Sequence, residues 1–241
     1  MKNLKTTMVM LFITSGLGLG LYSCKKDAAA TSTPVTVTEA DAAELATDAI
    51  TPTTGGFALQ VNSSVSIYKN VALSCGGKKD STISKTSASG ATPAYSYNLS
   101  WDYMLTCAGI VPSQLTFNFT GSSTFDGPRM SSDDKSTGGF VLTNLQPTAS
   151  TYTLSSTYVR NGTQTSKIAR KYTFTSNLSI TSNNVLVDKT TLKIVSGTAA
   201  VTLTGTSSSG KSFSFNGTIT FQGNNKANLV LISGASYAIS W

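Results

Sequence analysis

The sequence predicts an all-β protein built as an antiparallel meander of about ten to twelve strands. Three observations lead to this prediction. Apolar and polar residues alternate with period two in many segments after Phe57, and short segments rich in glycine, asparagine and serine separate them. Charged residues make up only 12% of the chain, whereas serine, threonine, asparagine and glycine are abundant. No segment after residue 55 shows convincing helical periodicity.

The clearest strand is predicted around residues 95–106. Successive side chains of a strand point to opposite faces, so this segment has one apolar face and one mostly polar face. Trp101 and Tyr103 are therefore expected in the core and not as sugar-stacking residues, and Asp102 is expected to face solvent. The last forty residues predict four more short strands with glycine-bearing turns between them. The apolar face is formed by Tyr95, Tyr97, Leu99, Trp101, Tyr103 and Leu105.

Strands with one apolar face must bury that face against another layer. A β-sandwich does so without needing a ligand, so we expect a sandwich. A half-open or closed β-barrel around a ligand satisfies the same pattern and is the alternative. A barrel in the membrane is disfavoured, because several apolar runs are shorter than the roughly 9–11 residues of a tilted spanning strand.

The segment before the predicted sheet differs in composition. Residues 24–54 contain alanine, threonine and proline runs and are expected to form a tether, whereas residues 55–241 are expected to form a single all-β domain. One short helix is predicted inside the tether, from Glu39 to Ile50 with Thr38 as its N-cap. Its apolar positions are few, so the helix is expected to be marginal in isolation.

The N-terminus carries a basic start, an uncharged run from Thr6 to Leu21 and then Tyr22-Ser23-Cys24. This pattern resembles the lipobox signal of bacterial lipoproteins. The resemblance implies a signal peptide at residues 1–23 and a mature N-terminal Cys24 that carries a diacylglyceryl thioether and an N-acyl chain such as palmitate. Two or more acyl chains anchor a protein stably to a membrane. Lys25 lacks the aspartate that resembles an inner-membrane retention signal, so the outer membrane is expected, facing either the periplasm or the cell surface.

Two cysteines remain once Cys24 is assigned to lipid. In an oxidising compartment, Cys75 and Cys107 predict one structural disulfide. A zinc site is disfavoured because two cysteines without histidine supply only half of a zinc shell.

The chain contains no histidine, which excludes Ser-His-Asp and Cys-His catalysis and removes the usual general base near neutral pH. No catalytic residue and no cofactor is predicted. Paired carboxylates are the remaining enzymatic chemistry, and Asp126, Asp133 and Asp134 are weak candidates for an acid pair or a metal site. Asp126-Gly127-Pro128 and the segment from Met130 to Lys135 are more simply interpreted as a turn and a solvated loop.

These observations predict a lipid-anchored cell-envelope protein whose β-domain is a non-catalytic binding or structural module. A glycan or an envelope protein is the expected partner, and nucleic acid is not expected. One alternative is a carrier for an apolar ligand in a half-closed barrel, with the Glu39–Ile50 helix as a lid, an arrangement that resembles lipoprotein-carrier folds. The other is a carboxylate-dependent enzyme acting on polysaccharide.

Overall fold

The structure is a computed structural model that describes residues 36–168 and 172–241. The predicted signal peptide and Cys24 lie outside the described residues. One compact unit, Pro34–Trp241, includes all the residues that are described. Within it, neither helix combines the length and the apolar character needed to cross a membrane.

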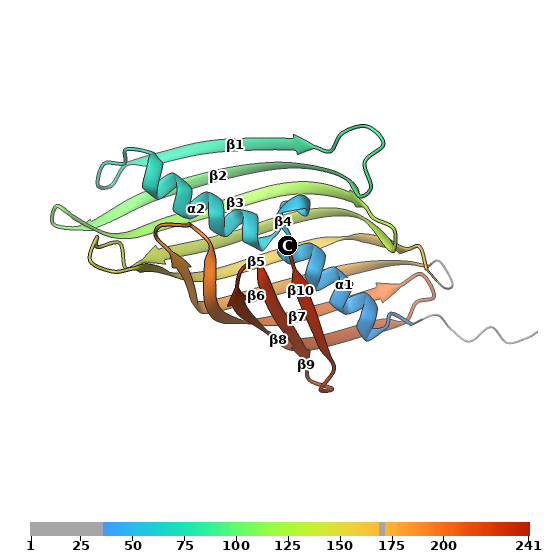
Figure 1. The fold of residues 1–241 in the computed structure, drawn as a ribbon. Helices are drawn as coiled ribbons and strands as arrows, with labels where there is room; N and C mark the ends of the chain where they lie inside the picture. The colour runs from blue at the N-terminus through green and yellow to red at the C-terminus, as the bar shows by residue number, and fades with distance from the viewer. Residues whose placement is uncertain (1–35, 169–171) are drawn as a thin grey trace, which may run out of the picture. The chain divides into compact units, whose positions relative to one another are not determined.

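Ten antiparallel strands form one continuous sheet in which every strand pairs with its neighbours in sequence (Figure 1). This confirms the all-β meander. The sheet is open between β1 and β10, and residues 36–168 and 172–241 form no second sheet that could stack on it. The half-open alternative therefore describes the architecture, and the sandwich does not. The strands are β1 Lys78–Thr86, β2 Ala94–Ala108, β3 Val111–Asp126, β4 Met130–Thr143, β5 Thr151–Ser166, β6 Thr173–Asp188, β7 Ile194–Ser207, β8 Ser212–Gly223, β9 Lys226–Leu231 and β10 Ser236–Ser240.

The period-two pattern determines which face of the sheet is buried. On β2, Leu99, Trp101 and Tyr103 are buried, while Ser100 and Asp102 between them are exposed. The same alternation continues across the sheet to β10. One face is therefore apolar over most of its area, and the other is a solvated surface of serine, threonine and asparagine.

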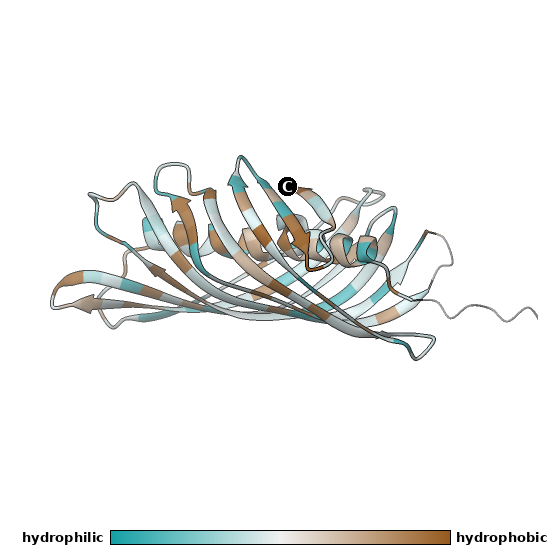
Figure 2. Cartoon of the chain, turned by 90° about the horizontal axis from the view of Figure 1, so that it is seen from below, coloured by the Kyte–Doolittle hydropathy of each residue, from teal (hydrophilic) through white to brown (hydrophobic). Residues whose placement is uncertain are grey.

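Helices cover the buried face and replace the second sheet of a sandwich. The sheet curves around α1 (Glu39–Ile50), the 3₁₀ turn η1 (Pro52–Thr54) and α2 (Phe57–Asn70), which lie in its hollow (Figure 2). Two N-terminal helices thus bury the apolar faces that the sandwich prediction assigned to a second sheet.

The predicted helix from Glu39 to Ile50 is present with those bounds as α1. Thr38 and Asp41 form a capping box, in which each side chain accepts a hydrogen bond from the other residue's backbone N–H. Eight of its twelve residues are buried. The helix is therefore part of the folded core and not of a tether.

The expectation of strands from Phe57 onward is wrong for the first fourteen residues, which form α2. Phe57, Val61 and Val65 recur every four residues and are fully buried, which is the spacing of one helix face. The β-branched character of Val61 and Val65 and the polar run Asn62-Ser63-Ser64 between them obscured that period. Phe57 anchors the helix, with its ring centroid 5.5 Å from that of Phe140 and 5.7 Å from that of Phe221.

The predicted disulfide is present and joins Cys75, just before β1, to Cys107 near the end of β2, with the Cα atoms 5.6 Å apart. It ties the edge strand β1 to its only neighbour in the sheet.

Replacing both Cys75 and Cys107 by alanine should lower the free energy of unfolding by about 3–4 kcal/mol, because the crosslink closes a loop of about 33 residues in the unfolded chain. Thermal unfolding of the double variant checks this. The unmodified protein under reducing conditions should match the variant, and an unchanged melting temperature in both would contradict the prediction.

Candidate functional site

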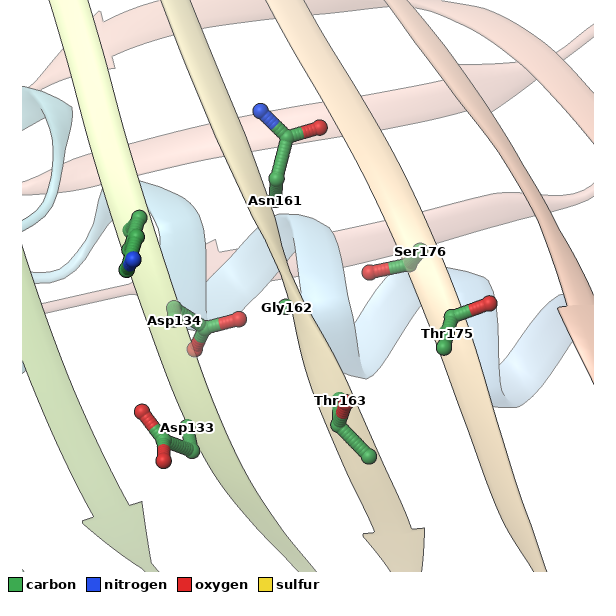
Figure 3. Close-up of a pocket in the computed structure, with 8 residues that line it drawn as sticks. Asp133, Asp134, Asn161, Gly162, Thr163, Thr175 and Ser176 are labelled. Carbon is green, nitrogen blue, oxygen red and sulfur yellow. The ribbon is translucent and has the colours of Figure 1, made fainter.

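One part of the concave face is polar, although it is buried. We call this region the polar floor. It spans β3 to β6, on the inward faces that elsewhere carry aliphatic and aromatic side chains. A close-up through the sheet shows part of it, with α1 passing behind the strands that carry Asp134, Gly162 and Ser176 (Figure 3). The buried residues of the polar floor are Ser123, Ser132, Asp134, Ser136, Arg160, Gln164, Ser166 and Ser176.

Arg160 lies at the centre of the polar floor and is only 3% exposed. Its Nη2 donates to Asp134 Oδ2 at 2.5 Å, forming an ion pair inside the protein. The other carboxylate oxygen, Asp134 Oδ1, accepts a hydrogen bond from Gln164 Nε2 at 2.8 Å. Burial is the largest single influence and lowers the pKa of Arg160, but Asp134, Tyr158 and Asp48 together raise it by more, so the guanidinium remains charged.

Arg160 also attaches the sheet to α1. Its Nη1 donates to the backbone carbonyl of Asp48 at 2.9 Å, in the last turn of the helix. Carbonyls at this end of a helix lack intrahelical partners and carry a partial negative charge, and α1 has no basic residue of its own there. The hydroxyls of Thr51 and Thr54 donate to the same carbonyl, so Arg160 adds one further donor and the positive charge at the C-terminal end of α1.

The Asp134 side chain occupies its position because residue 162 is glycine. Asp134 and Gly162 are directly opposite each other on β4 and β5. A Cβ atom on residue 162 would overlap Asp134 Oδ1 and would lie 2.5 Å from the carbonyl oxygen of Asp133. Because Gly162 has no side chain, the Asp134 carboxylate can occupy the space in which it contacts Arg160.

The carboxyl group of Asp48 has an unusual environment. Burial raises its pKa to about 7, Arg160 opposes that shift, and the nearby acids Glu44 and Asp134 add to it. Asp48 therefore titrates close to neutral pH inside the α1–sheet interface.

Two further polar contacts hold α1 in place. Tyr172, which precedes β6, donates from its hydroxyl to Asp41 Oδ2, and burial together with this carboxylate raises the pKa of Tyr172. Arg129 Nε contacts Glu44 Oε2 at 3.2 Å on the surface.

The three predicted acidic candidates do not form one site. Asp126 ends β3, is exposed and pairs with Lys167. Asp133 and Asp134 lie in strand β4 and not in a loop, so they point to opposite faces, Asp133 outward and Asp134 inward. Asp133 lines a shallow hollow on the outer face with Asn161, Thr163 and Thr175 (Figure 3). Among the described residues, no group of three potential metal-ligating side chains occurs.

Sequence reasoning missed Arg160, Gln164 and Asp48. The sequence does contain a signal for Arg160 and Gln164, because the alternation along β5 places them on the same face as the buried residues Tyr152 and Tyr158. A charged side chain at an inward position of a strand indicates a buried, partnered charge.

In comparisons with known proteins, no family model, no curated protein and no solved structure matches this chain. The function must therefore be argued from the geometry described above.

Replacing Gly162 by alanine should destabilise the fold by about 3 kcal/mol or more, because the added methyl group displaces a buried, ion-paired carboxylate. Chemical denaturation measures the loss. Gly139→Ala is the matched control on β4, since a Cβ there meets only the Asn118 side chain at 3.3 Å. Equal effects of the two substitutions would contradict the assigned role of Gly162.

Replacing Asp48 by asparagine should remove a pH dependence of stability. The folded protein holds the Asp48 proton up to about pH 7, whereas the unfolded chain loses it near 3.8. The stability that Asp48 contributes should therefore be fully present below pH 4 and should be lost, by at most about 4 kcal/mol, as the pH rises through 7. Asp48→Asn should melt higher than the unmodified protein at pH 8, but not at pH 4.

Thermal melts from pH 4 to pH 8 test this, with the exposed Asp133→Asn as the control that keeps the original profile. Parallel profiles for Asp48→Asn and the unmodified protein would show that Asp48 does not titrate in this range.

Proposed function

We propose that this chain is a lipid-anchored envelope protein whose β-domain binds a ligand and does not catalyse a reaction. The anchor would be Cys24, on the resemblance of residues 19–27 to a lipobox. Fourteen residues separate Cys24 from the start of α1 at Glu39, which limits the distance from the membrane to about 50 Å when fully extended.

The observation that carries a binding role is the construction of the concave face. Its apolar part is lined by large side chains such as Phe117, Phe140 and Tyr158, and its polar part is the polar floor around Arg160. A surface divided in this way complements an amphiphile, with a chain on the aromatic part and a polar end near Arg160. This favours the carrier form of the proposal over a structural role.

In the carrier form, α1 is the lid. The buried apolar residues of α1 are four alanines (Ala42, Ala43, Ala46 and Ala49) with Leu45 and Ile50, whereas α2 buries Phe57, Ala58, Val61 and Val65. Burial of an alanine contributes less hydrophobic free energy than burial of a larger side chain. Because α1 depends more on a few polar contacts, it is the element of the interior that opens at the lowest cost.

A glycan or an envelope protein remains a partner for the polar outer face. The enzymatic alternative has less support. Asp133 and Asp134 point to opposite faces, and the buried Asp134 is already committed to Arg160. An acid pair for glycoside hydrolysis needs two carboxyl groups facing one substrate.

Two measurements test the proposal. Mass spectrometry of the protein from a lipidating bacterial host should find an acylated N-terminal Cys24, and Cys24→Ser should abolish membrane retention. An unmodified thiol at residue 24 would remove the anchor.

Ligand binding is tested by titration with a fluorescent long-chain fatty acid. Tyr172→Phe removes the hydrogen bond to Asp41 and should weaken lid closure by about 1 kcal/mol, which raises the apparent affinity roughly fivefold. Tyr95→Phe, at a half-buried tyrosine of β2, should leave the affinity unchanged. Absence of binding by all three proteins would contradict the carrier form.

A further inference from the structure

Three polar atoms in the interface between α1 and β5 have no hydrogen-bond partner among the described residues. They are Asp48 Oδ2, Arg160 Nε and Gln164 Oε1. Their residues are 7%, 3% and 0% exposed, so bulk solvent does not reach them. The two acceptors and one donor therefore need a partner that the described part of the chain does not provide.

The three side chains belong to a single network. Arg160 bonds to the backbone of Asp48 and to the carboxylate of Asp134, and Asp134 in turn accepts from Gln164. Arg160 Nε belongs to the guanidinium that makes two of these bonds, and Gln164 Oε1 belongs to the amide that makes the third. Asp48 Oδ2 belongs to the residue whose backbone carbonyl accepts from Arg160. The residues that carry the three atoms are thus joined to one another where β4 and β5 meet the C-terminal end of α1.

Buried polar groups in native proteins are almost always hydrogen-bonded, and internal water commonly provides the partner, typically through about three bonds. One N–H donor and two oxygen acceptors match a water molecule, which has two O–H donors and two lone pairs. The match persists when Asp48 is protonated, since water can then accept from its O–H.

We infer that Asp48, Arg160 and Gln164 form a binding site for one uncharged hydroxyl oxygen, which accepts from Arg160 Nε and donates to Asp48 Oδ2, to Gln164 Oε1 or, in the case of water, to both. A water molecule occupies it in the ligand-free protein. In the carrier form of the proposed function, on which this second source rests, the hydroxyl of an amphiphile replaces the water.

Charge argues for an uncharged occupant. Arg160 is already paired with Asp134 at 2.5 Å, so a bound anion would face two carboxyl groups, Asp134 and Asp48. A bound cation would face the guanidinium. Neither an anion nor a cation would find an unpaired group of opposite charge at this site to offset its desolvation. An alcohol has one O–H, so it can donate either to the ionised Asp48 carboxylate or to Gln164 Oε1, but not to both. Water can donate to both and is therefore the occupant in the ligand-free protein.

A crystal structure of the purified protein at about 1.5 Å resolution tests the inference. We expect an isolated oxygen peak at about 2.7–3.2 Å from all three atoms. Density continuous with a longer molecule would identify an amphiphile hydroxyl and would support the carrier as well. An empty space, or side chains turned to bond one another, would overturn the inference while leaving the anchor and a binding role at another surface intact.

A matched pair of variants provides a solution test. Asp48→Asn keeps an oxygen acceptor in place, whereas Gln164→Met removes the acceptor and fills the space with an apolar group of similar length. Oxygen-17 relaxation dispersion counts long-lived internal water. Asp48→Asn should retain the count of the unmodified protein, and Gln164→Met should have one fewer. An equal count in all three proteins would overturn the site, and the crystal structure of the unmodified protein decides the question if Gln164→Met does not fold.

Discussion

The position of α1 depends on the guanidinium of Arg160. This one group forms an ion pair with Asp134 on the neighbouring strand and caps the last turn of the helix through the carbonyl of Asp48. A buried charge of this kind costs desolvation free energy, so its partners must be complete for the fold to tolerate it. Gly162 is part of that requirement, because a side chain there would occupy the space of the carboxylate. The sheet, the C-terminal end of α1 and Gly162 on β5 therefore depend on one another.

The helices also explain why the sheet remains open. An antiparallel sheet with one apolar face must be covered, and a second sheet or closure into a barrel are the usual solutions. Here α2 inserts Phe57 among the rings of Phe140, Tyr158 and Phe221. Because the helices occupy the hollow, β1 and β10 need not meet. The large ring of Phe57 on α2 packs against the apolar part of the sheet, whereas four of the residues that α1 buries are alanines. The two helices therefore pack against the sheet with side chains of different size.

The sequence allowed the strands to be predicted because their signal is local. Alternation in residues 95–105 reports directly on the buried face, and the cap at Thr38 locates the start of α1. The helix at Phe57–Asn70 was missed because two of its buried positions are the β-branched Val61 and Val65 with serines between them, a pattern that fits either structure over a few residues. Asp133 and Asp134 were placed in a loop on composition alone. The Arg160 cluster depends on contacts between α1, β4 and β5, and no local pattern specifies such contacts.

The order of the elements along the chain has a consequence for assembly. Every strand pairs with the one before it, so the sheet can grow by successive hairpins during synthesis. The helices are made first, yet Arg160 follows Asp48 by 112 positions. α1 therefore waits for Arg160 until β5 is made, whereas α2 can already bond through Gln60 to Trp101 on β2. Most of the apolar residues of α1 are alanines, so the waiting helix exposes little apolar surface for each residue.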